Sequence, residues 1–426
     1  MIFKAHNIGV FNDISMEIPK LTLLAGCNGS GKSTISKSLY LMLNGVTNFE
    51  NYLSIELYDQ LDAFGKEIEK EFKNNTKKSI IDKTELLKNS VYNKLEELRT
   101  IIKNTVIDEK VLNDILVFFK ENRKYSDSKN IDLLDEYLSK GNESEMGETL
   151  LSRMINSEFS NQLCNFNSQD MEILLEEGDN KAYIKYYDKK YQFYFNDFDI
   201  SSIHYFGSSS SLDRDGFLLD NPMRYLNIID IDHIIYLIMN LRKGKESYSV
   251  KDELAQKEFV GIFDPILTKI IGGGFEYDSE RKEIFYNDGS HRVDLKNVAS
   301  GAKVLGTLEL LIKNGCIDTN SMIIIDEPEN SLHPMWQVKF AKVIVELVAK
   351  TSIKVFINSH SPFFIDALNQ ISSKYSNLND NVKFYQTTYE KDEYKVLDCT
   401  ENINELFVTL AEPYDYLEKE LQNDLD

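Results

Sequence analysis

Gly26-Cys27-Asn28-Gly29-Ser30-Gly31-Lys32-Ser33-Thr34 matches the phosphate-loop pattern GxxxxGK[ST] at every fixed position. Glycines let the backbone wrap around a phosphate chain, and the helix that follows presents the positive end of its dipole. An apolar run at 21–25 precedes the loop and helical spacing at 33–43 follows it, as this pattern requires. We therefore assign every residue of the stretch except Cys27 to a phosphate site, with Lys32 reaching the β and γ phosphates and Ser33 binding Mg²⁺.

An acidic pair ends a buried strand far along the chain. Four apolar residues, Met322 to Ile325, are typical of a strand covered on both faces of a parallel sheet, and Asp326 and Glu327 follow them. Ligands bind at the carboxyl edge of such sheets, and successive strand side chains point to opposite sides. We expect Asp326 to hold Mg²⁺, directly or through water, and Glu327 to activate the attacking water.

A histidine follows the next apolar strand. The run 353–357 leads into Asn358-Ser359-His360, one helix-plus-strand unit after the Asp326 strand. A lone histidine at a strand end is more often a packed or capping residue. Its position on a neighbouring strand end favours a second interpretation, in which His360 senses the γ-phosphate and orients Glu327 or the water.

A serine–glycine pair opens a helix that runs to about residue 314. Ser300 suits an N-cap, so a simply capped helix is one interpretation. A capping box would place Glu or Gln where Lys303 stands, and a cation has the wrong sign for a helix N-terminus. The conflict disappears if that end receives an anion, so we assign Ser300, Gly301 and Lys303 to phosphate binding. The inferred strand order leaves them far from the loop of their own chain, which predicts a head-to-tail dimer.

The order of patterns predicts an α/β fold. Residues 1–48 and 171–426 would form a phosphate-loop head with a mixed sheet and an antiparallel hairpin lobe, and 49–170 a helical insertion. Alternating apolar residues predict hairpins at 182–195, 275–286 and 382–397. In the insertion, apolar residues recur at spacings of three and four. We expect the helices to bury this stripe among themselves, with a partner-docking surface as the alternative.

Composition excludes several classes of protein. A formal net charge of −21 argues against a protein that coats nucleic acid nonspecifically, because such affinity comes from neutralising phosphates. The four cysteines are scattered without CxxC spacing, so neither a structural zinc site nor a disulfide framework is expected. The most apolar stretch, 228–241, contains three charged or titratable residues and is too short to span a bilayer. We expect a cytoplasmic protein without a membrane segment.

Taken in this order, the four motifs resemble those of the ABC ATPase superfamily. Asp326-Glu327-Pro328-Glu329-Asn330-Ser331-Leu332-His333-Pro334 and Asn358-Ser359-His360-Ser361-Pro362 are similar to the soluble OLD-type and RecF-like branch. That branch includes phage-defence ATPases such as PtuA of the Septu system and AriA of the PARIS system. The resemblance is strong over 1–48 and 297–365 and looser over 172–296. It implies an ABC-ATPase head that hydrolyses ATP to ADP and phosphate with Mg²⁺, as a homodimer or higher even oligomer.

The departures from the family pattern exclude some of the functions found in the family. The signature motif of the family is Leu-Ser-Gly-Gly-Gln, whereas residues 299–303 of this chain read Ala-Ser-Gly-Ala-Lys. A membrane-transporter subunit is therefore not expected. Gln192 is the candidate for a Q-loop glutamine. OLD enzymes carry a C-terminal Toprim nuclease, but too few residues follow His360 for that domain, and the chain has only six His without an HNH-like cluster. A separately encoded effector, in particular a nuclease, is therefore the expected partner.

Three functions remain open at this point. In the leading interpretation, an ATP-driven dimer senses a trigger and controls the effector in anti-phage defence. The alternative is a DNA-clamping repair or recombination ATPase of the RecF or SMC type, and the third is an ATP-gated scaffold. The basic stretches 73–78 and 242–245 are the candidates for direct nucleic-acid contact, although charged stretches are usually solvated faces.

Overall fold

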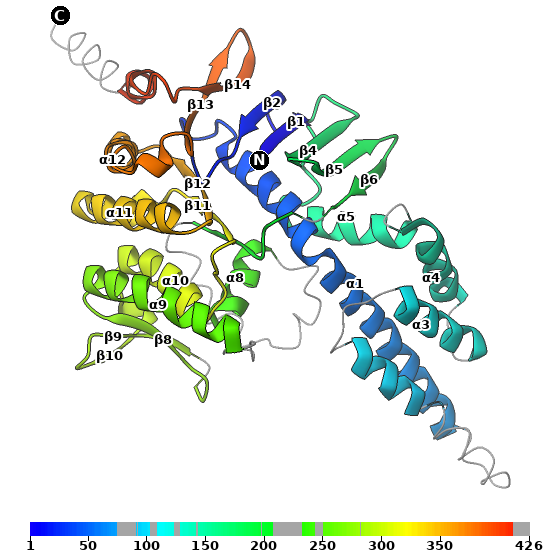
Figure 1. The fold of residues 1–426 in the computed structure, drawn as a ribbon. Helices are drawn as coiled ribbons and strands as arrows, with labels where there is room; N and C mark the ends of the chain where they lie inside the picture. Colours follow the sequence, from blue (N-terminus) through cyan, green and yellow to red (C-terminus); the bar gives the residue numbers. More distant parts are fainter. Residues whose placement is uncertain are drawn as a thin grey trace, which may run out of the picture.

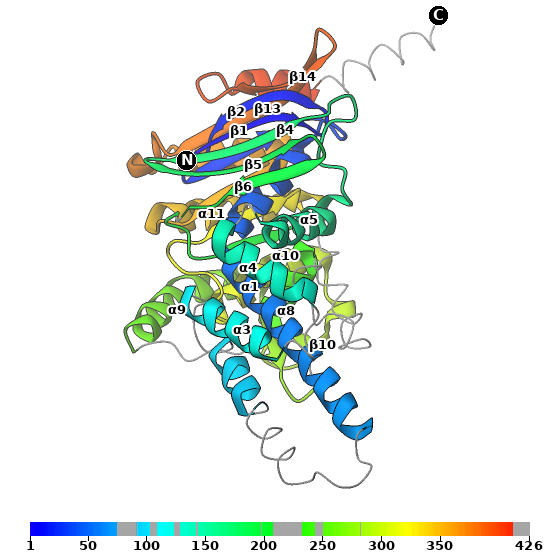
Figure 2. The same cartoon turned by 90° about the vertical axis from the view of Figure 1, so that its right-hand side faces the viewer.

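A computed structural model provides the fold of the chain (Figures 1 and 2). It describes residues 1–74, 91, 93–102, 109–122, 128–141, 144–196, 198–207, 232–242, 250–281 and 283–411. These residues form an eleven-stranded mixed sheet of order β6-β5-β4-β1-β2-β14-β13-β3-β12-β11-β7, a separate three-stranded sheet of order β10-β9-β8, and helices around both. The serine run 208–211, most of the two basic stretches and the tail after 411 lie outside the described residues.

One end of the large sheet is the expected antiparallel lobe. Its strands are β1 (Ile2–Ile8), β2 (Phe11–Glu17), β4 (Met171–Glu177), β5 (Asn180–Tyr187) and β6 (Lys190–Tyr194). Ala182 and Ile184 of β5 and Phe193 of β6 face the core, as the alternation predicts. Asp188 and Lys189 form the two-residue turn with positive φ at both positions, the geometry that matches the twist of a hairpin. The hairpin at 182–195 is confirmed.

The other end of the sheet is mainly parallel. It contains β3 (Leu21–Ala25), β7 (Ile203–Phe206), β11 (Met322–Asp326), β12 (Lys354–Ser359), β13 (Val382–Glu390) and β14 (Glu393–Asp398). β13, β3, β12, β11 and β7 run parallel, so their carboxyl ends lie at one edge. β14 returns antiparallel to β13 and bridges to β2 through Tyr394 and Phe11, which joins the two parts of the sheet.

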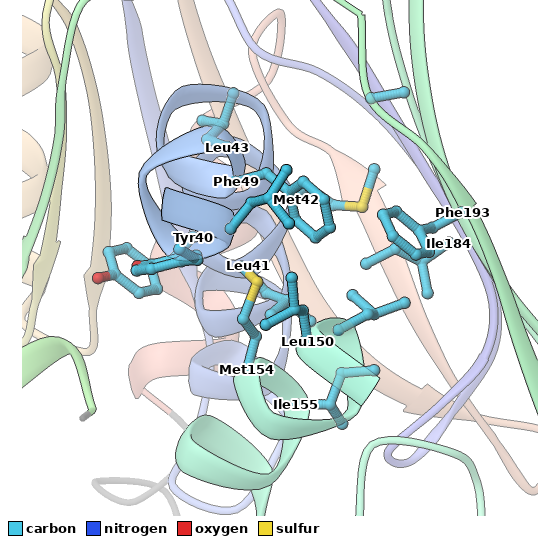
Figure 3. Close-up of a cluster of buried hydrophobic side chains, with 14 of the residues drawn as sticks. Tyr40, Leu41, Met42, Leu43, Phe49, Leu150, Met154, Ile155, Ile184 and Phe193 are labelled. Carbon is cyan, nitrogen blue, oxygen red and sulfur yellow. The ribbon is translucent and has the colours of Figure 1, made fainter. Parts of the chain in front are cut away.

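Helices cover the two faces of the parallel strands separately. On one face, α10 (Ser300–Lys313), α11 (Pro334–Lys350) and α12 (Pro362–Ser372) share a buried core with Ile323 and Ile325. On the other, α1 (Lys32–Asn74) packs in the core that contains Ile324. This second core continues under the antiparallel lobe, where Leu41, Met42 and Phe49 of α1 meet side chains of α5, β5 and β6 (Figure 3).

The helix after the phosphate loop is longer than the sequence pattern indicates. We expected it to end after Leu43, but α1 continues unbroken for 43 residues into the insertion, across the boundary drawn at 48/49 (Figure 1). Gly45 does not end the helix. A Cβ at this position would lie 2.3 Å from the ring of Phe195, so the glycine allows a close approach of that ring. The head and the insertion therefore share one continuous helix.

The insertion continues with α3 (Glu109–Glu121), α4 (Ser128–Lys140) and α5 (Glu145–Phe159). Leu57, Leu61 and Phe64 of α1 are buried, and the Phe64 ring lies 5.1 Å from Phe118 and 5.5 Å from Phe119 of α3. Leu95 and Leu98, in the helical segment 93–102, are also fully buried. Within the described residues, the prediction that the insertion buries its own apolar stripe is confirmed.

A smaller layer packs beside α10. It consists of α8 (His233–Arg242), α9 (Val250–Ile271) and the strands β8 (Gly274–Asp278), β9 (Glu283–Asn287) and β10 (Arg292–Asp294). The hairpin expected at 275–286 is β8–β9, and the one expected at 382–397 is β13–β14. Short 3₁₀ turns η3 (Leu295–Asn297), η4 (Pro328–Ser331) and η5 (Ser376–Leu378) complete the order. Within the part of the chain that the structure describes, no helix is long and apolar enough to cross a bilayer.

Candidate active site

The phosphate loop connects β3 to α1 at the carboxyl edge of the sheet. Helix α1 begins at Lys32, directly after the loop. Gly26 has φ +153° and Gly31 has φ +87°, which side chains other than glycine rarely adopt. Space is limited as well, because a Cβ on Gly31 would lie 2.4 Å from the ring of Phe11. Glycine is therefore required at both positions for the loop to take this path.

Lys32 lies inside the loop that it is expected to serve. Its side chain is 4 % exposed, and Nζ donates to the carbonyl oxygens of Gly26 at 2.7 Å and Cys27 at 2.9 Å. Burial lowers the pKa of Lys32, while the nearby Glu327 and Asp326 raise it. An ammonium group has three N–H donors, so one remains for an anion beside the loop.

Asp326 is held at the start of α1 by three donors. The Ser33 hydroxyl donates to Oδ2 at 2.9 Å, the Tyr205 hydroxyl donates to Oδ2 at 3.0 Å, and the Asn358 amide donates to Oδ1 at 2.9 Å. The loop and β11 thus bring a hydroxyl and a carboxylate oxygen together. Such oxygens are the ligands Mg²⁺ prefers, and it usually takes one or two carboxylates beside phosphate and water. Among the described residues there is no all-protein cage of three or more His, Cys, Asp or Glu, which is consistent with that pattern.

Glu327 adopts a left-handed conformation, with φ 49° and ψ 54°. This conformation is costly for a side chain with a Cβ and is common at functional sites. The backbone N–H of Glu327 donates to the Asn358 carbonyl at 3.0 Å, and its Oε2 accepts a hydrogen bond from the Asn330 amide at 2.7 Å. The turn after β11 therefore holds the carboxylate apart from Asp326, and its side chain is 28 % exposed.

His360 lies between two carboxylates. Its Nδ1 is 3.6 Å from Oε1 of Glu327 and 3.4 Å from Oε1 of Glu329, and its side chain is 37 % exposed. Glu329 is buried and its Oε1 accepts three hydrogen bonds, from the Ser359 hydroxyl at 2.7 Å and the backbone N–H groups of His360 at 2.8 Å and Ser361 at 3.2 Å. The turn after β11 is thereby bonded to the loop that carries His360.

The helix that opens with Ser300 lies apart from this cluster. Ala299 is the N-cap of α10 and makes no side-chain capping bond, whereas Ser300 is the first helical residue and is exposed. The interpretation of Ser300 as a simple cap is therefore wrong. α10 packs on the opposite face of the parallel strands from α1, and Lys303 is 5 % exposed. The structure does not bring Ser300 and Gly301 to the phosphate loop of their own chain.

Gln192 is also remote from the site. It lies exposed on β6, the outermost strand of the antiparallel lobe, and six strands of the sheet stand between β6 and β3. The structure therefore does not support the candidate Gln192 as a Q-loop glutamine. A strand-like alternation could not reveal this, because the position of a strand within a sheet depends on pairing with distant segments.

Sequence reasoning missed several residues that support the site. Tyr205 lies on a short apolar strand without any motif; burial raises the pKa of its hydroxyl well above the usual value, so it remains a donor to Asp326. Asn358 and Glu329 stand inside the motifs that carried the resemblance, and their polar character beside apolar strands was the available signal. No pattern in the sequence indicated a role at the site for Thr387, on β13.

Comparison with known protein families agrees with this geometry. The family model described as the AAA ATPase domain matches residues 3–365, most of the chain. The chain belongs to the AAA ATPase domain family. The matched region includes the phosphate loop, the carboxylates after β11 and His360, and it ends before β13. The expectation of an AAA ATPase domain with a mixed α/β fold is confirmed.

Solved structures to which this chain is similar include SMC head domains and an ATP-binding cassette. The head domain of SMC from Thermotoga maritima has 11 % identity and a TM-score of 0.39, with 93 % of this chain and 97 % of that chain covered. The SMC head from Pyrococcus furiosus, bound to a domain of ScpA, has 12 % identity, a TM-score of 0.41 and coverages of 99 % and 98 %. An ATP-binding cassette of an ABC transporter has 10 % identity, a TM-score of 0.31 and coverages of 93 % and 89 %. No curated protein matches the sequence.

Proposed function

We propose that this AAA ATPase binds Mg²⁺-ATP at the loop 26–34 and hydrolyses it to ADP and phosphate. The observation that supports the proposal most strongly is the hydrogen bond of 2.9 Å between the Ser33 hydroxyl and the Asp326 carboxylate. It joins a phosphate loop to a strand-end carboxylate, with Glu327 as the next residue. ATP and Mg²⁺ are the ligands that this donor set fits.

Each residue of the cluster has a distinct role in this proposal. Lys32 would neutralise charge on the transferred phosphoryl group with its remaining N–H, and Ser33 and Asp326 would hold Mg²⁺, which would supply further positive charge beside the phosphates. Glu327 accepts the proton of the attacking water. His360, beside Oε1 of Glu327, orients that carboxylate and contacts the γ-phosphate. Glu327 is fixed by Asn330 and by its own backbone, so little reorganisation is needed before reaction.

We also propose that the site is completed by a second copy of the chain. Ser300, exposed at the start of α10, and Gly301 would contact the γ-phosphate held by the partner, with Lys303 one turn further along the helix, because α10 lies across the sheet from its own phosphate loop. Two large apolar side chains support an interface at this edge. Met335 is 59 % exposed and Phe363 is 49 % exposed, at the first turns of α11 and α12, the helices that follow Glu327 and His360 in the chain. A partner that covers the site would remove both from water.

The biological role we propose is control of a separately encoded effector, in particular a nuclease, by the ATP-driven dimer. The support is the similarity of 326–334 and 358–362 to the phage-defence ATPases of the OLD-type branch. The DNA-clamping alternative predicts that the ATP-bound protein alone binds duplex DNA and that affinity falls steeply with salt. Tight binding of a neighbouring-gene product without such DNA binding favours effector control.

Replacement of Glu327 tests the proposed chemistry. In Glu327→Gln the amide cannot accept the proton of water, so turnover should fall by about 10²–10⁴-fold while ATP and Mg²⁺ still bind. Phosphate release measures turnover, and titration with a fluorescent ATP analogue measures binding. Glu401→Gln, on the exposed surface, is the matched control and should behave as the wild type. If Glu327→Gln hydrolyses ATP normally, or fails to bind it, the proposed role of Glu327 is wrong.

A further inference from the structure

The hairpin β13–β14 lies outside the matched family region, which ends at residue 365. Its first strand nevertheless pairs with β3, the strand that leads into the phosphate loop. Gln386 stands opposite Ala25, the last residue of β3. The next residue on β13, Thr387, therefore lies beside the first residues of the loop.

Thr387 is connected to the loop through its hydroxyl. The side chain is 3 % exposed, and Oγ1 donates to the carbonyl oxygen of Ala25 at 3.2 Å and lies 2.6 Å from Oγ of Ser30. A hydroxyl has one proton. Either hydroxyl can donate in the shorter bond, and Ser30 is the donor whenever Thr387 donates to Ala25. The two hydroxyls therefore connect Ser30 to the end of β3.

Gly26 provides a second, independent contact with the same atom. A Cβ on Gly26 would lie 1.8 Å from Oγ1 of Thr387. The hydroxyl of Thr387 thus occupies the space where any other residue at 26 would place its side chain. The first residue of the loop and its fifth, Ser30, both rest on one side chain of the hairpin.

The hairpin also supports the other end of the loop. The rings of Tyr389 and Tyr394 lie 4.9 Å apart across the hairpin, and Tyr394 lies 6.1 Å from Phe11. Phe11 in turn fills the space next to Gly31. Residues of β13 and β14 therefore support both ends of the loop, Thr387 directly and Tyr394 through Phe11.

We propose that Thr387 is a positioning residue for the nucleotide, which acts by fixing the phosphate loop through Ser30 and Gly26. The inference rests on the proposed function. Loop N–H groups bind phosphate well only when they converge before the ligand arrives, since ordering them on binding would reduce affinity. Thr387 would fix the loop N–H groups in this way, although it lies more than 350 positions from Ser30 in the sequence.

Three variants separate this role from simple packing. Thr387→Val replaces the hydroxyl by a methyl group, Thr387→Ser keeps the hydroxyl, and Thr388→Val changes a partly exposed neighbour on the opposite side of β13. Thr387→Val removes both hydrogen bonds of Oγ1. Loss of the one to Ser30, inside the loop, should raise Kd and KM for Mg²⁺-ATP by about fivefold, with kcat little changed. Thr387→Ser and Thr388→Val should match the wild type.

Further measurements make each outcome decisive. Ser30→Ala removes the same bond from the other side, so adding it to Thr387→Val should weaken binding no further. The inference is overturned if Thr387→Val binds ATP as the wild type does, or if Thr387→Ser loses as much affinity as Thr387→Val. In either case the proposed function stands as long as Lys32→Ala loses binding. If wild type and Lys32→Ala bind ATP equally, the proposed function itself fails.

Discussion

At the scale of single residues, Glu329 connects the turn that carries Glu327 to the loop that carries His360. One of its oxygens accepts three hydrogen bonds from 359–361. The other oxygen is buried and has no hydrogen-bond partner among the described residues. A buried carboxylate oxygen without a partner is costly, and such a group in a folded protein calls for an explanation in the role of a neighbour. Here that neighbour is His360, whose backbone Glu329 fixes and whose ring lies beside it.

Removal of this carboxylate should therefore affect both stability and turnover. In Glu329→Ala the Ser359 hydroxyl and two N–H groups lose their acceptor, which should lower the free energy of unfolding by about 1–3 kcal/mol. Because the His360 loop is released, kcat should fall more than ATP affinity. Chemical denaturation and steady-state kinetics measure the two effects, with the exposed Glu405→Ala as control. A variant as stable and as active as the wild type would show that Glu329 does not hold this loop.

At the scale of the element, β7 closes the parallel end of the described sheet and carries a buried histidine. Nε2 of His204 lies 2.8 Å from the Cys316 carbonyl, and burial lowers the pKa of His204 to about 4. In the unfolded chain the pKa is near the usual value of 6.5. Between these two values the unfolded state binds the extra proton, so acid favours unfolding.

The stability provided by β7 should consequently depend on pH. It is fully present above about pH 6.5 and is lost as the pH falls towards 4, by up to about 3 kcal/mol. His204→Gln keeps a donor for the Cys316 carbonyl but does not titrate. Denaturation curves between pH 7 and pH 4 should show a smaller loss in the variant than in the wild type. Equal losses in both proteins would contradict the assigned pKa.

The elements that the sequence predicts are those with local signals. The phosphate loop, the apolar strands before Asp326 and Asn358, and the three hairpins follow from patterns within a few residues of one another. The length of α1 does not follow from a local pattern. Gly45 lowers the helix propensity at its position, but a glycine is needed there because the ring of Phe195 packs against it. The place of β13 beside β3, and with it the contact of Thr387, depends on pairing between segments that no local pattern connects.

At the scale of the whole molecule, one long helix links the nucleotide site to the insertion. α1 starts at Lys32, in the loop 26–34, and reaches Asn74, about 65 Å at 1.5 Å per residue. Its far half packs against α3 within the insertion (Figure 2). A movement of the loop when nucleotide binds would therefore be transmitted as a movement of the helix. This gives the insertion a physical connection to the state of the site.

The central claim is that two chains build each nucleotide site, Lys32 from one and Ser300 from the other. Lys32→Ala and Ser300→Arg proteins should each be inactive alone, because each homodimer lacks one half of both sites. We predict that mixing them under conditions of subunit exchange restores part of the ATPase activity, since a heterodimer contains one intact site. Exchange is verified by copurification of two different tags. A mixture that stays inactive despite exchange, or normal hydrolysis by a strict monomer, would contradict the claim.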